Sequence, residues 1–455
     1  MTDSFRFDTE NLDKLRAALV RLEAGFAALP PVPTPKPDAV REMDTVLQEV
    51  AQRLHDNFPY FHPLYAGQML KPPHPVARLA YALAMWINPN NHALDGGRAS
   101  SRMEKEAVAE IARMFEWETH LGHLCAGGTM ANLEALWVAG QLRPGSMVLA
   151  SQQAHYTHAR ISAVLGLPFE SVACDRAGRL DVGALRTRLD RGGVGTVVGT
   201  IGTTATGAVD PVPELLHLRE RYEFRLHADA AYGGYFGLAD NLARETRAAY
   251  DALGTADSIV IDPHKHGLQP YGCGCVLFRD SGVGRFYKHD SPYTYFSSGD
   301  LHLGEISLEC SRPGASAVAL WATQRLLPLV RGGGFAQMLS DGREAALSLH
   351  DRLRHDARFV TTHAPELDIV VWAPRSRSVS ESSAISRQIF AEAARRGLHL
   401  ALADLSTDLF DLEGIERDRE ALTCLRSVLM KREHCEWIDR IWDILDTSTD
   451  IVVRG

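Results

Sequence analysis

From about residue 120 to about residue 330, short apolar runs alternate with stretches of helical periodicity. The apolar runs have the length of strands, and glycine or polar turn residues follow each of them. Parallel strands need such helical crossovers between them. The alternation therefore predicts an α/β fold, with a mostly parallel sheet, helices on both faces and chemistry at the carboxyl ends of the strands. The predicted strands cover residues 147–150, 196–199, 224–228 and 258–261, and helices over 131–138 and 212–222 lie between them.

The two ends of the chain have a different character. Leucines at helical spacing predict a helix around residues 12–22, and a proline-rich connector separates it from a second amphipathic helix over 38–54. After about Gly332 long helices predominate, with a few strands between them. We therefore predict three parts: an N-terminal helical arm over 1–92, a large domain over 93–330 and a small C-terminal α+β domain over 331–455.

The helices of the predicted arm carry apolar stripes that a detached pair of helices cannot bury. Leu12, Leu15, Leu19 and Leu22 form one stripe, and a second follows from Val40 to Leu54. Packing against a second copy of the chain would cover both stripes, so the arm predicts a homodimer.

Composition narrows the classes of partner and the compartment. The chain has 455 residues and a net charge of −9, which argues against a nucleic acid or an anionic membrane as partner. Its apolar runs are all shorter than the roughly 20 residues of a membrane span, and the residues from Met1 to Ser4 do not resemble the start of an export signal. The seven cysteines are scattered without a framework spacing, which is typical of the reducing cytoplasm. Cys273 and Cys275 lie in a strand pattern and are interpreted as core residues.

Lys265 is the most distinctive candidate for chemistry. It follows the apolar run 259–261 in a turn bounded by Pro263 and Gly267, with His264 and His266 on either side. A lysine at a strand end, partly desolvated by apolar neighbours, is suited to form a Schiff base with an aldehyde. A surface lysine in an ordinary loop is the alternative for this residue taken alone.

Three further strand ends carry complementary groups. Gly127, Gly128 and Thr129 join a short strand to a helix, where free amides and the helix dipole favour a phosphate. His155 follows the next strand and offers a flat ring that could cover an aromatic ligand. Asp229 ends a later strand and is followed by small residues, so its carboxylate could pair with a protonated pyridine nitrogen. Together with Lys265 these groups specify pyridoxal 5'-phosphate.

These motifs resemble those of the group II pyridoxal-phosphate-dependent amino-acid decarboxylases, which include the glutamate, aromatic-amino-acid, tyrosine and histidine decarboxylases. The resemblance rests on the residues 127–132, on His155, on 202–204, on the block that begins at Asp229, and above all on 262–265. It implies the fold-type I architecture with a seven-stranded central sheet, and an obligate dimer with sites at the subunit interface.

The resemblance also implies a role for each residue. Lys265 would form the Schiff base, Asp229 would face the pyridine nitrogen, and His155 and Ala231 would pack on opposite faces of the ring. The phosphate would be held by Gly127, Gly128, Thr129 and His264, with Thr204 near the ring. Asp262 departs from the neutral residue of some relatives, and an anion there would not favour a phosphate unless it faces away, so it is not included among the cofactor-binding residues.

The substrate-binding residues are predicted from looser signals. Arg312 matches an arginine that in relatives lies near the substrate carboxylate, which suits its bidentate fork. His62 and Asn88 lie in aromatic-rich or turn segments that could line a substrate pocket or be solvated turns. The segment 287–303 is predicted to be a mobile lid, and Tyr293 or Tyr295 could assist protonation of the substrate Cα.

The sequence thus predicts a carboxy-lyase that converts an L-amino acid to its amine and CO2. An aldehyde-forming oxidative decarboxylation or deamination and a carbon–carbon lyase reaction stay open as alternatives, because the motifs bind the cofactor without fixing which bond breaks. A protein that only binds partners is disfavoured because it would have no use for Lys265 together with Asp229.

Overall fold

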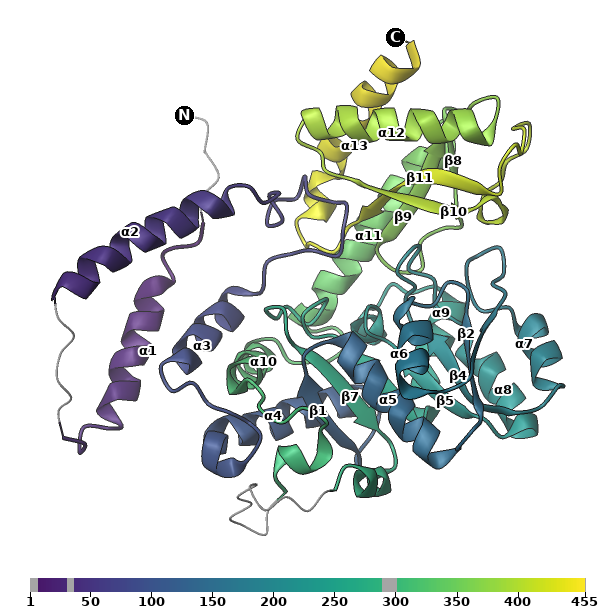
Figure 1. Ribbon diagram of the computed structural model, residues 1–455. Helices are drawn as coiled ribbons and strands as arrows, with labels where there is room; N and C mark the ends of the chain where they lie inside the picture. Colours follow the sequence, from purple (N-terminus) through teal and green to yellow (C-terminus); the bar gives the residue numbers. More distant parts are fainter. Residues whose placement is uncertain (1–6, 31–36, 289–300, 455) are drawn as a thin grey trace.

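A computed structural model of the chain describes residues 7–30, 37–288 and 301–454. Its largest feature is a seven-stranded sheet in the order β1-β7-β6-β5-β4-β2-β3 (Figure 1). The strands are β1 (Leu121–Cys125), β2 (Met147–Ser151), β3 (Phe169–Val172), β4 (Val194–Thr200), β5 (Arg225–Asp229), β6 (Ser258–Ile261) and β7 (Gly274–Phe278).

Most neighbouring strands of this sheet run parallel, as the alternating pattern predicted. β2 pairs in parallel with β3 and β4, β4 with β5, and β5 with β6. Only β7 runs against its neighbours, and it lies between β6 and β1. Because β7 opposes both, β1 and β6 point the same way, and their last residues, Cys125 and Ile261, pair with Gly274 and Cys275 at the start of β7.

Helices cover both faces of the sheet because alternate strand residues are apolar on both sides. Val148 and Ala150 of β2 pack with Leu136 and Ile161, which lie on the helices of one face. Leu149 between them belongs to the core on the opposite face. The first face carries α5 (Gly128–Leu142) and α6 (Thr157–Leu165), whereas the second core includes residues of α4 (Leu94–Met114), α7 (Val182–Leu189), α8 (Val212–Tyr222), α9 (Arg244–Asp251) and α10 (Gly314–Leu326).

The C-terminal part of the chain contains a second, antiparallel sheet in the order β10-β11-β9-β8. Three helices pack with it around a separate core that includes Trp372, Leu349, Ile389 and Ile441. The strands are β8 (Phe359–Thr361), β9 (Ile369–Pro374), β10 (Ala401–Ser406) and β11 (Ala421–Val428), and the helices are α11 (Gly334–His355), α12 (Val379–Arg395) and α13 (His434–Arg454).

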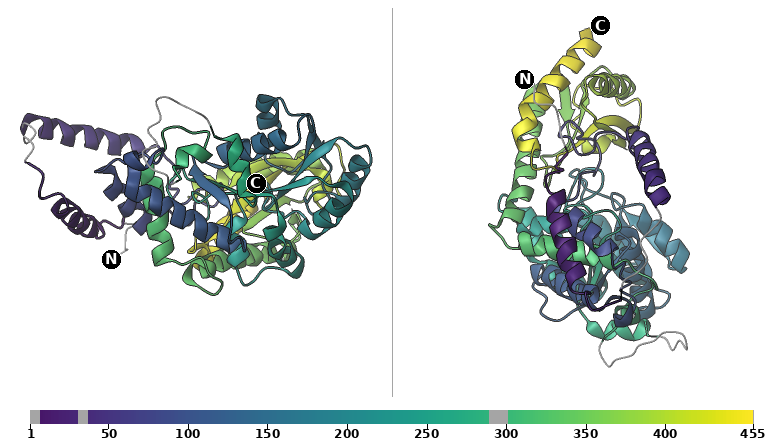
Figure 2. Two further views of the ribbon diagram at one scale, coloured as in Figure 1. Left: turned by 90° about the horizontal axis from the view of Figure 1, so that it is seen from below. Right: turned by 90° about the vertical axis from the view of Figure 1, so that its left-hand side faces the viewer.

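The first two helices lie at the edge of the molecule (Figures 1 and 2), and the first of them contacts α3 (Pro75–Met85). α1 (Leu12–Ala24) has no buried residue, and α2 (Pro37–Leu54) exposes Met43, Val46, Leu47, Val50 and Leu54. α3 in turn packs on α10. Both arm helices therefore form where the sequence predicted them. The apolar stripe of α2 faces solvent in a single chain, whereas Leu15, Leu19 and Leu22 of α1 are half-buried.

Two global features follow from the described residues. None of their helices combines the length and the apolar character that a membrane crossing requires. All seven cysteines are free thiols, and Cys273 and Cys275 are buried in the core as predicted.

Candidate active site

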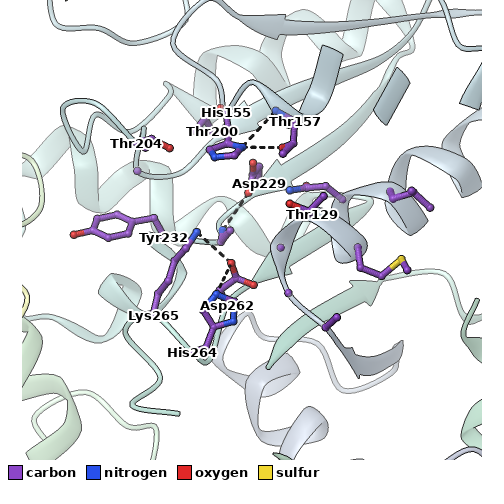
Figure 3. A pocket seen from close by; sticks show the side chains of 18 residues that line it. Thr129, His155, Thr157, Thr200, Thr204, Asp229, Tyr232, Asp262, His264 and Lys265 are labelled. Carbon is purple, nitrogen blue, oxygen red and sulfur yellow. Dashed lines mark hydrogen bonds and ion pairs between the residues drawn. The ribbon is translucent and has the colours of Figure 1, made fainter. Parts of the chain in front are cut away.

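A cavity of about 500 Å³ lies at the carboxyl ends of the central strands (Figure 3). Its wall is built from the segments that follow β1, β2, β4, β5 and β6. The crossovers thus bring to one place residues that are far apart in the sequence. All the residues predicted to bind the cofactor line it: Gly127, Gly128, Thr129, His155, Thr204, Asp229, Ala231, His264 and Lys265.

Lys265 lies in the turn after β6, and its ammonium faces the carboxylate of Asp262 (Figure 3). The distance from Nζ to Oδ2 is 3.1 Å, and the backbone N–H of Lys265 donates to the carbonyl of Asp262 at 2.9 Å. Asp262 also lines the cavity and is only 2% exposed. A carboxylate so deeply buried needs a cation close by, and Lys265 supplies it.

His264 ties the same turn to strand β7. Its Nδ1 lies 2.9 Å from the carbonyl oxygen of Cys273, to which it donates, and its Nε2 lies 3.6 Å from Oδ2 of Asp262. Burial lowers the pKa of His264 despite the nearby carboxylate. The neutral ring can therefore offer polar contacts at the cavity wall without adding a full charge at neutral pH.

Asp229 ends β5 and presents a second buried carboxylate to the cavity. Its Oδ1 accepts the N–H of Ala231 at 3.2 Å, and its Oδ2 accepts a hydrogen bond from Nε2 of His158 at 2.8 Å. Burial alone would raise the pKa of Asp229, but the hydrogen bond from His158 and the neighbouring positive charges outweigh it and hold the pKa below its usual range. The wall of the cavity thus carries a permanent negative charge at this point.

His155 follows β2 and lines the cavity on the side away from Lys265 and Asp262 (Figure 3). Its Nδ1 lies 2.9 Å from Oγ1 of Thr157 and also accepts the backbone N–H of that residue at 3.4 Å. Burial lowers the pKa of His155. A neutral ring held in one orientation is suited to lie against the face of an aromatic ligand.

The turn between β1 and α5 passes unusually close to its neighbours. A Cβ atom on Gly128 would lie 2.6 Å from Oδ2 of Asp262, and one on Gly274 of β7 would lie 2.5 Å from the carbonyl carbon of Gly127. Only glycine permits this approach. Because Gly127 at the N-cap has no side chain, the first N–H groups of α5 stay available for an anion.

Comparison with known proteins assigns the chain to a protein family. Residues 138–374 match the family model of the pyridoxal-dependent decarboxylase conserved domain. The chain belongs to the pyridoxal-dependent decarboxylase family. Asp229, His264 and Lys265 lie inside the matched stretch, and the glycine turn lies just before it. The cofactor of this decarboxylase is pyridoxal 5'-phosphate, and the enzyme is an amino-acid decarboxylase, which confirms both predictions.

Individual relatives agree with this assignment. The L-tyrosine decarboxylase of Enterococcus faecium is 27% identical, over 78% of this chain and 76% of its own length. A probable L-tyrosine/L-aspartate decarboxylase of Methanothermobacter thermautotrophicus is 31% identical, over 57% of this chain and 70% of its own length. Among solved structures, mouse CSAD aligns with a TM-score of 0.78 at 18% identity, covering 97% of this chain and 99% of that one. Oryza sativa TDC with PLP and tryptamine aligns with a TM-score of 0.77 at 18% identity, over 98% and 99%. The predicted fold class is thereby confirmed.

The residues of this decarboxylase fit its cofactor. The glycine turn leaves backbone donors for a phosphate, Asp229 presents a buried carboxylate that requires a cation, and Lys265 presents a primary amine. These three groups lie on the wall of one cavity.

The residues predicted to bind substrate lie elsewhere in the described part of this decarboxylase. Arg312 is 4% exposed, and its guanidinium donates to Glu104 at 2.8 Å and to the carbonyl of Leu124 at 2.6 Å, so it is committed to a buried ion pair and not to the cavity. His62 packs edge-on against Trp437 of α13, and Asn88 is exposed after α3. Tyr293 and Tyr295 fall outside the described residues.

Three polar groups of the site were not predicted from the sequence. Asp262 turns toward Lys265 and the cavity. His158 lies behind Asp229, and its position three residues after His155, at the start of a helix, is the one local signal that could have drawn attention to it. Asp368, from the segment before β9, accepts a hydrogen bond from the hydroxyl of Tyr232 at 2.5 Å, and Tyr232 lines the cavity.

Proposed function

We propose that this decarboxylase acts on an L-amino acid through a cofactor that is covalently held by Lys265. The observation that carries the proposal is the convergence on one cavity of the Lys265–Asp262 pair, the Asp229 carboxylate, the His155 ring and the glycine turn. No single one of these groups is diagnostic. Their combination matches what a phosphate, a pyridine ring and an aldehyde each require.

In this proposal the cofactor is bound at three points. Gly127, Gly128 and Thr129, with His264, hold the phosphate by backbone and side-chain donors. His155 and Ala231 pack on the two faces of the ring, with Thr204 at its edge. Asp229 holds a proton at the ring nitrogen because the carboxylate is ionised and buried.

When bound, pyridoxal 5'-phosphate supplies an aldehyde for the substrate amine and a ring that accepts the electron pair left behind by CO2. The chain contributes the environment for this chemistry. Asp262 keeps the amine of Lys265 oriented at the cavity wall. His155 and the buried strand ends exclude water from the reacting atoms, which limits quenching of the carbanion. The proton that Asp229 holds at the ring nitrogen would make the cofactor ring a stronger electron acceptor.

The substrate is proposed to be a tyrosine-like amino acid. Met130, Leu133 and Tyr232 contribute apolar and aromatic surface to the cavity wall, which suits an aromatic side chain better than a second carboxylate. The relatives named as tyrosine and as tyrosine/aspartate decarboxylases support testing these two amino acids first. Release of CO2 with tyramine would support the proposal, whereas CO2 release from aspartate alone, or an aldehyde product, would contradict it.

Lys265→Ala tests the central role. Borohydride treatment of the holoenzyme should fix the cofactor to the peptide that contains Lys265. The variant should show neither this adduct nor turnover, because none of the other described residues that line the cavity carries a primary amine. Lys14→Ala, which removes an exposed lysine on α1, is the matched control and should retain both. Cofactor still fixed by borohydride to Lys265→Ala protein would refute the assignment.

Three broader features are also proposed. Exposed apolar residues on α1 and α2 support a homodimer in which the arms pack on the partner. Light scattering after size exclusion measures the oligomeric state.

The two separate sheets support the division into an arm (1–92), a cofactor domain (93–330) and a C-terminal domain (331–455). The seven free thiols support a cytoplasmic location.

A further inference from the structure

His158 is a buried histidine that does not line the cavity but lies directly behind it. It sits at the start of α6, is 1% exposed, and reaches Asp229 across 71 positions of sequence. Its Nε2 is 2.8 Å from Oδ2 of Asp229. The other carboxylate oxygen accepts the N–H of Ala231, so His158 and the backbone together determine how the carboxylate is turned.

The hydrogen bonds define which nitrogen of this histidine faces the carboxylate. An ionised carboxylate only accepts, so Nε2 of His158 must carry a hydrogen. Nδ1 is fully buried and has no hydrogen-bond partner among the described residues. The hydrogen bond to Asp229 is therefore the one side-chain hydrogen bond that the described residues give to this ring, and it directs Nε2–H at the carboxylate.

The surrounding groups do not compete for this interaction. His227 from β5 lies 6.3 Å away between ring centroids, but its nitrogens are engaged with Ser258 and Asn132, and burial lowers its pKa to about 3. His155 and Lys265 are further titratable groups near Asp229, and both face it from the cavity side.

We propose that His158 is a positioning residue for Asp229: its Nε2–H orients the carboxylate and keeps it ionised, so that Asp229 can hold a proton at the ring nitrogen of the cofactor. The proposal rests on the proposed function of Asp229. Without His158, burial would favour the neutral carboxylic acid. The proton would then remain on Asp229 and the ring nitrogen would be neutral.

The test uses His158→Leu and His158→Gln in the full-length enzyme, loaded with cofactor labelled with 15N in the ring. In His158→Leu the 15N shift should move from the protonated toward the neutral position, and the dissociation constant of the cofactor should rise about tenfold or more, the usual size for a lost hydrogen bond to a charge. kcat should fall while KM changes little. His158→Gln keeps an N–H donor and should restore most of the 15N shift and of the affinity.

His123→Leu is the matched control. It removes another buried histidine that is paired with a carboxylate, Glu134, at 2.9 Å, but it does not touch Asp229. It should lower the unfolding temperature as much as His158→Leu does, with a normal 15N shift. A wild-type shift and affinity in His158→Leu, or an equal change in His123→Leu, would overturn the proposal. Asp229→Asn separates the role of Asp229 from that of His158. If this variant leaves the 15N shift unchanged, the proposed role of Asp229 itself fails. If it moves the 15N shift while His158→Leu does not, only the proposed role of His158 fails.

Discussion

Two buried carboxylates face one cavity from neighbouring strands, and each has a different basic partner. Asp229 accepts a hydrogen bond from Nε2 of His158, behind the cavity wall. Asp262 lies 3.1 Å from the ammonium of Lys265, which neutralises it. The two acids therefore offer a cofactor different environments: one carboxylate is held by a histidine ring behind the cavity, and the other is paired with the amine inside it.

Asp262→Asn tests this difference at the level of a single residue. The amide keeps a polar group beside Lys265 but removes a negative charge that lies next to the glycine turn. We expect the dissociation constant of the cofactor to fall by about threefold, because repulsion of the phosphate is relieved, and the gain to shrink as salt is added. Fluorescence titration of the apoenzyme measures both effects.

Weaker binding by the Asp262→Asn variant would mean that the carboxylate contributes to holding the cofactor through Lys265. The exposed Asp13→Asn change on α1 is the control for removing one negative charge from the chain, and it should leave the affinity unchanged.

At the scale of elements, the turn between β1 and α5 depends on close packing. A Cβ on Gly128 would overlap Asp262 at 2.6 Å and crowd Cβ of Ala231 at 3.2 Å. Gly128→Ala should therefore push the turn away from the cavity and weaken cofactor binding about tenfold. Gly334→Ala at the start of α11 is the matched control, since its Cβ would meet only Cδ2 of Leu327, at 3.6 Å. Equal affinities for both variants would show that the turn does not hold the phosphate.

The elements that the sequence predicted are those with a clear period. α8 has the predicted bounds, and β2, β4, β5 and β6 lie within a residue or two of theirs, because buried parallel strands are continuous apolar runs. β3 and β10 were not predicted, since Phe169–Val172 is short and Ala401–Ser406 mixes polar and apolar residues.

The part of the site that the sequence predicts is the part at the strand ends. Groups that follow a strand can be placed together, because the carboxyl ends of parallel strands share one edge of the sheet. The pairing of His158 with Asp229, and that of Glu104 with Arg312 across 208 positions, depend on how helices pack against the sheet. No local pattern specifies such packing, so the sequence alone predicts neither the contact of His158 with Asp229 nor the ion pair of Arg312 with Glu104.

At the scale of the whole molecule, Asp368 connects the C-terminal sheet to the cavity. Its carboxylate accepts from Tyr232 and lies 3.3 Å from Nε2 of His266, the residue after Lys265. Burial raises the pKa of Asp368 to about 6, although the hydrogen bond from Tyr232 and the charge of Lys71 oppose the rise. A single buried acid thus touches the turns that carry both Asp229 and Lys265.

This raised pKa predicts a pH dependence of stability. The folded state binds the proton of Asp368 more tightly than the unfolded state does. Protonated Asp368 therefore stabilises the fold fully below about pH 4, and this stabilisation is lost as the pH rises to about 6. For a shift of about two pKa units the loss is about 3 kcal/mol. Asp368→Asn should remove it, so that its free energy of unfolding, measured in urea across this range, falls less with rising pH than that of the parent. An unchanged slope would contradict the assignment, and Asp13→Asn is again the control.

The antiparallel strand β7 separates β1, which leads into the glycine turn, from β6, which leads into the lysine turn. Adjacent strands lie about 4.8 Å apart, so the ends of β1 and β6 are about 10 Å from each other. The two turns then bend toward each other, because a Cβ on Gly128 would lie 2.6 Å from Oδ2 of Asp262. The glycine turn and the lysine turn thus form one continuous wall, and a ligand meets both only if the arm between its phosphate and its carbonyl group matches their separation.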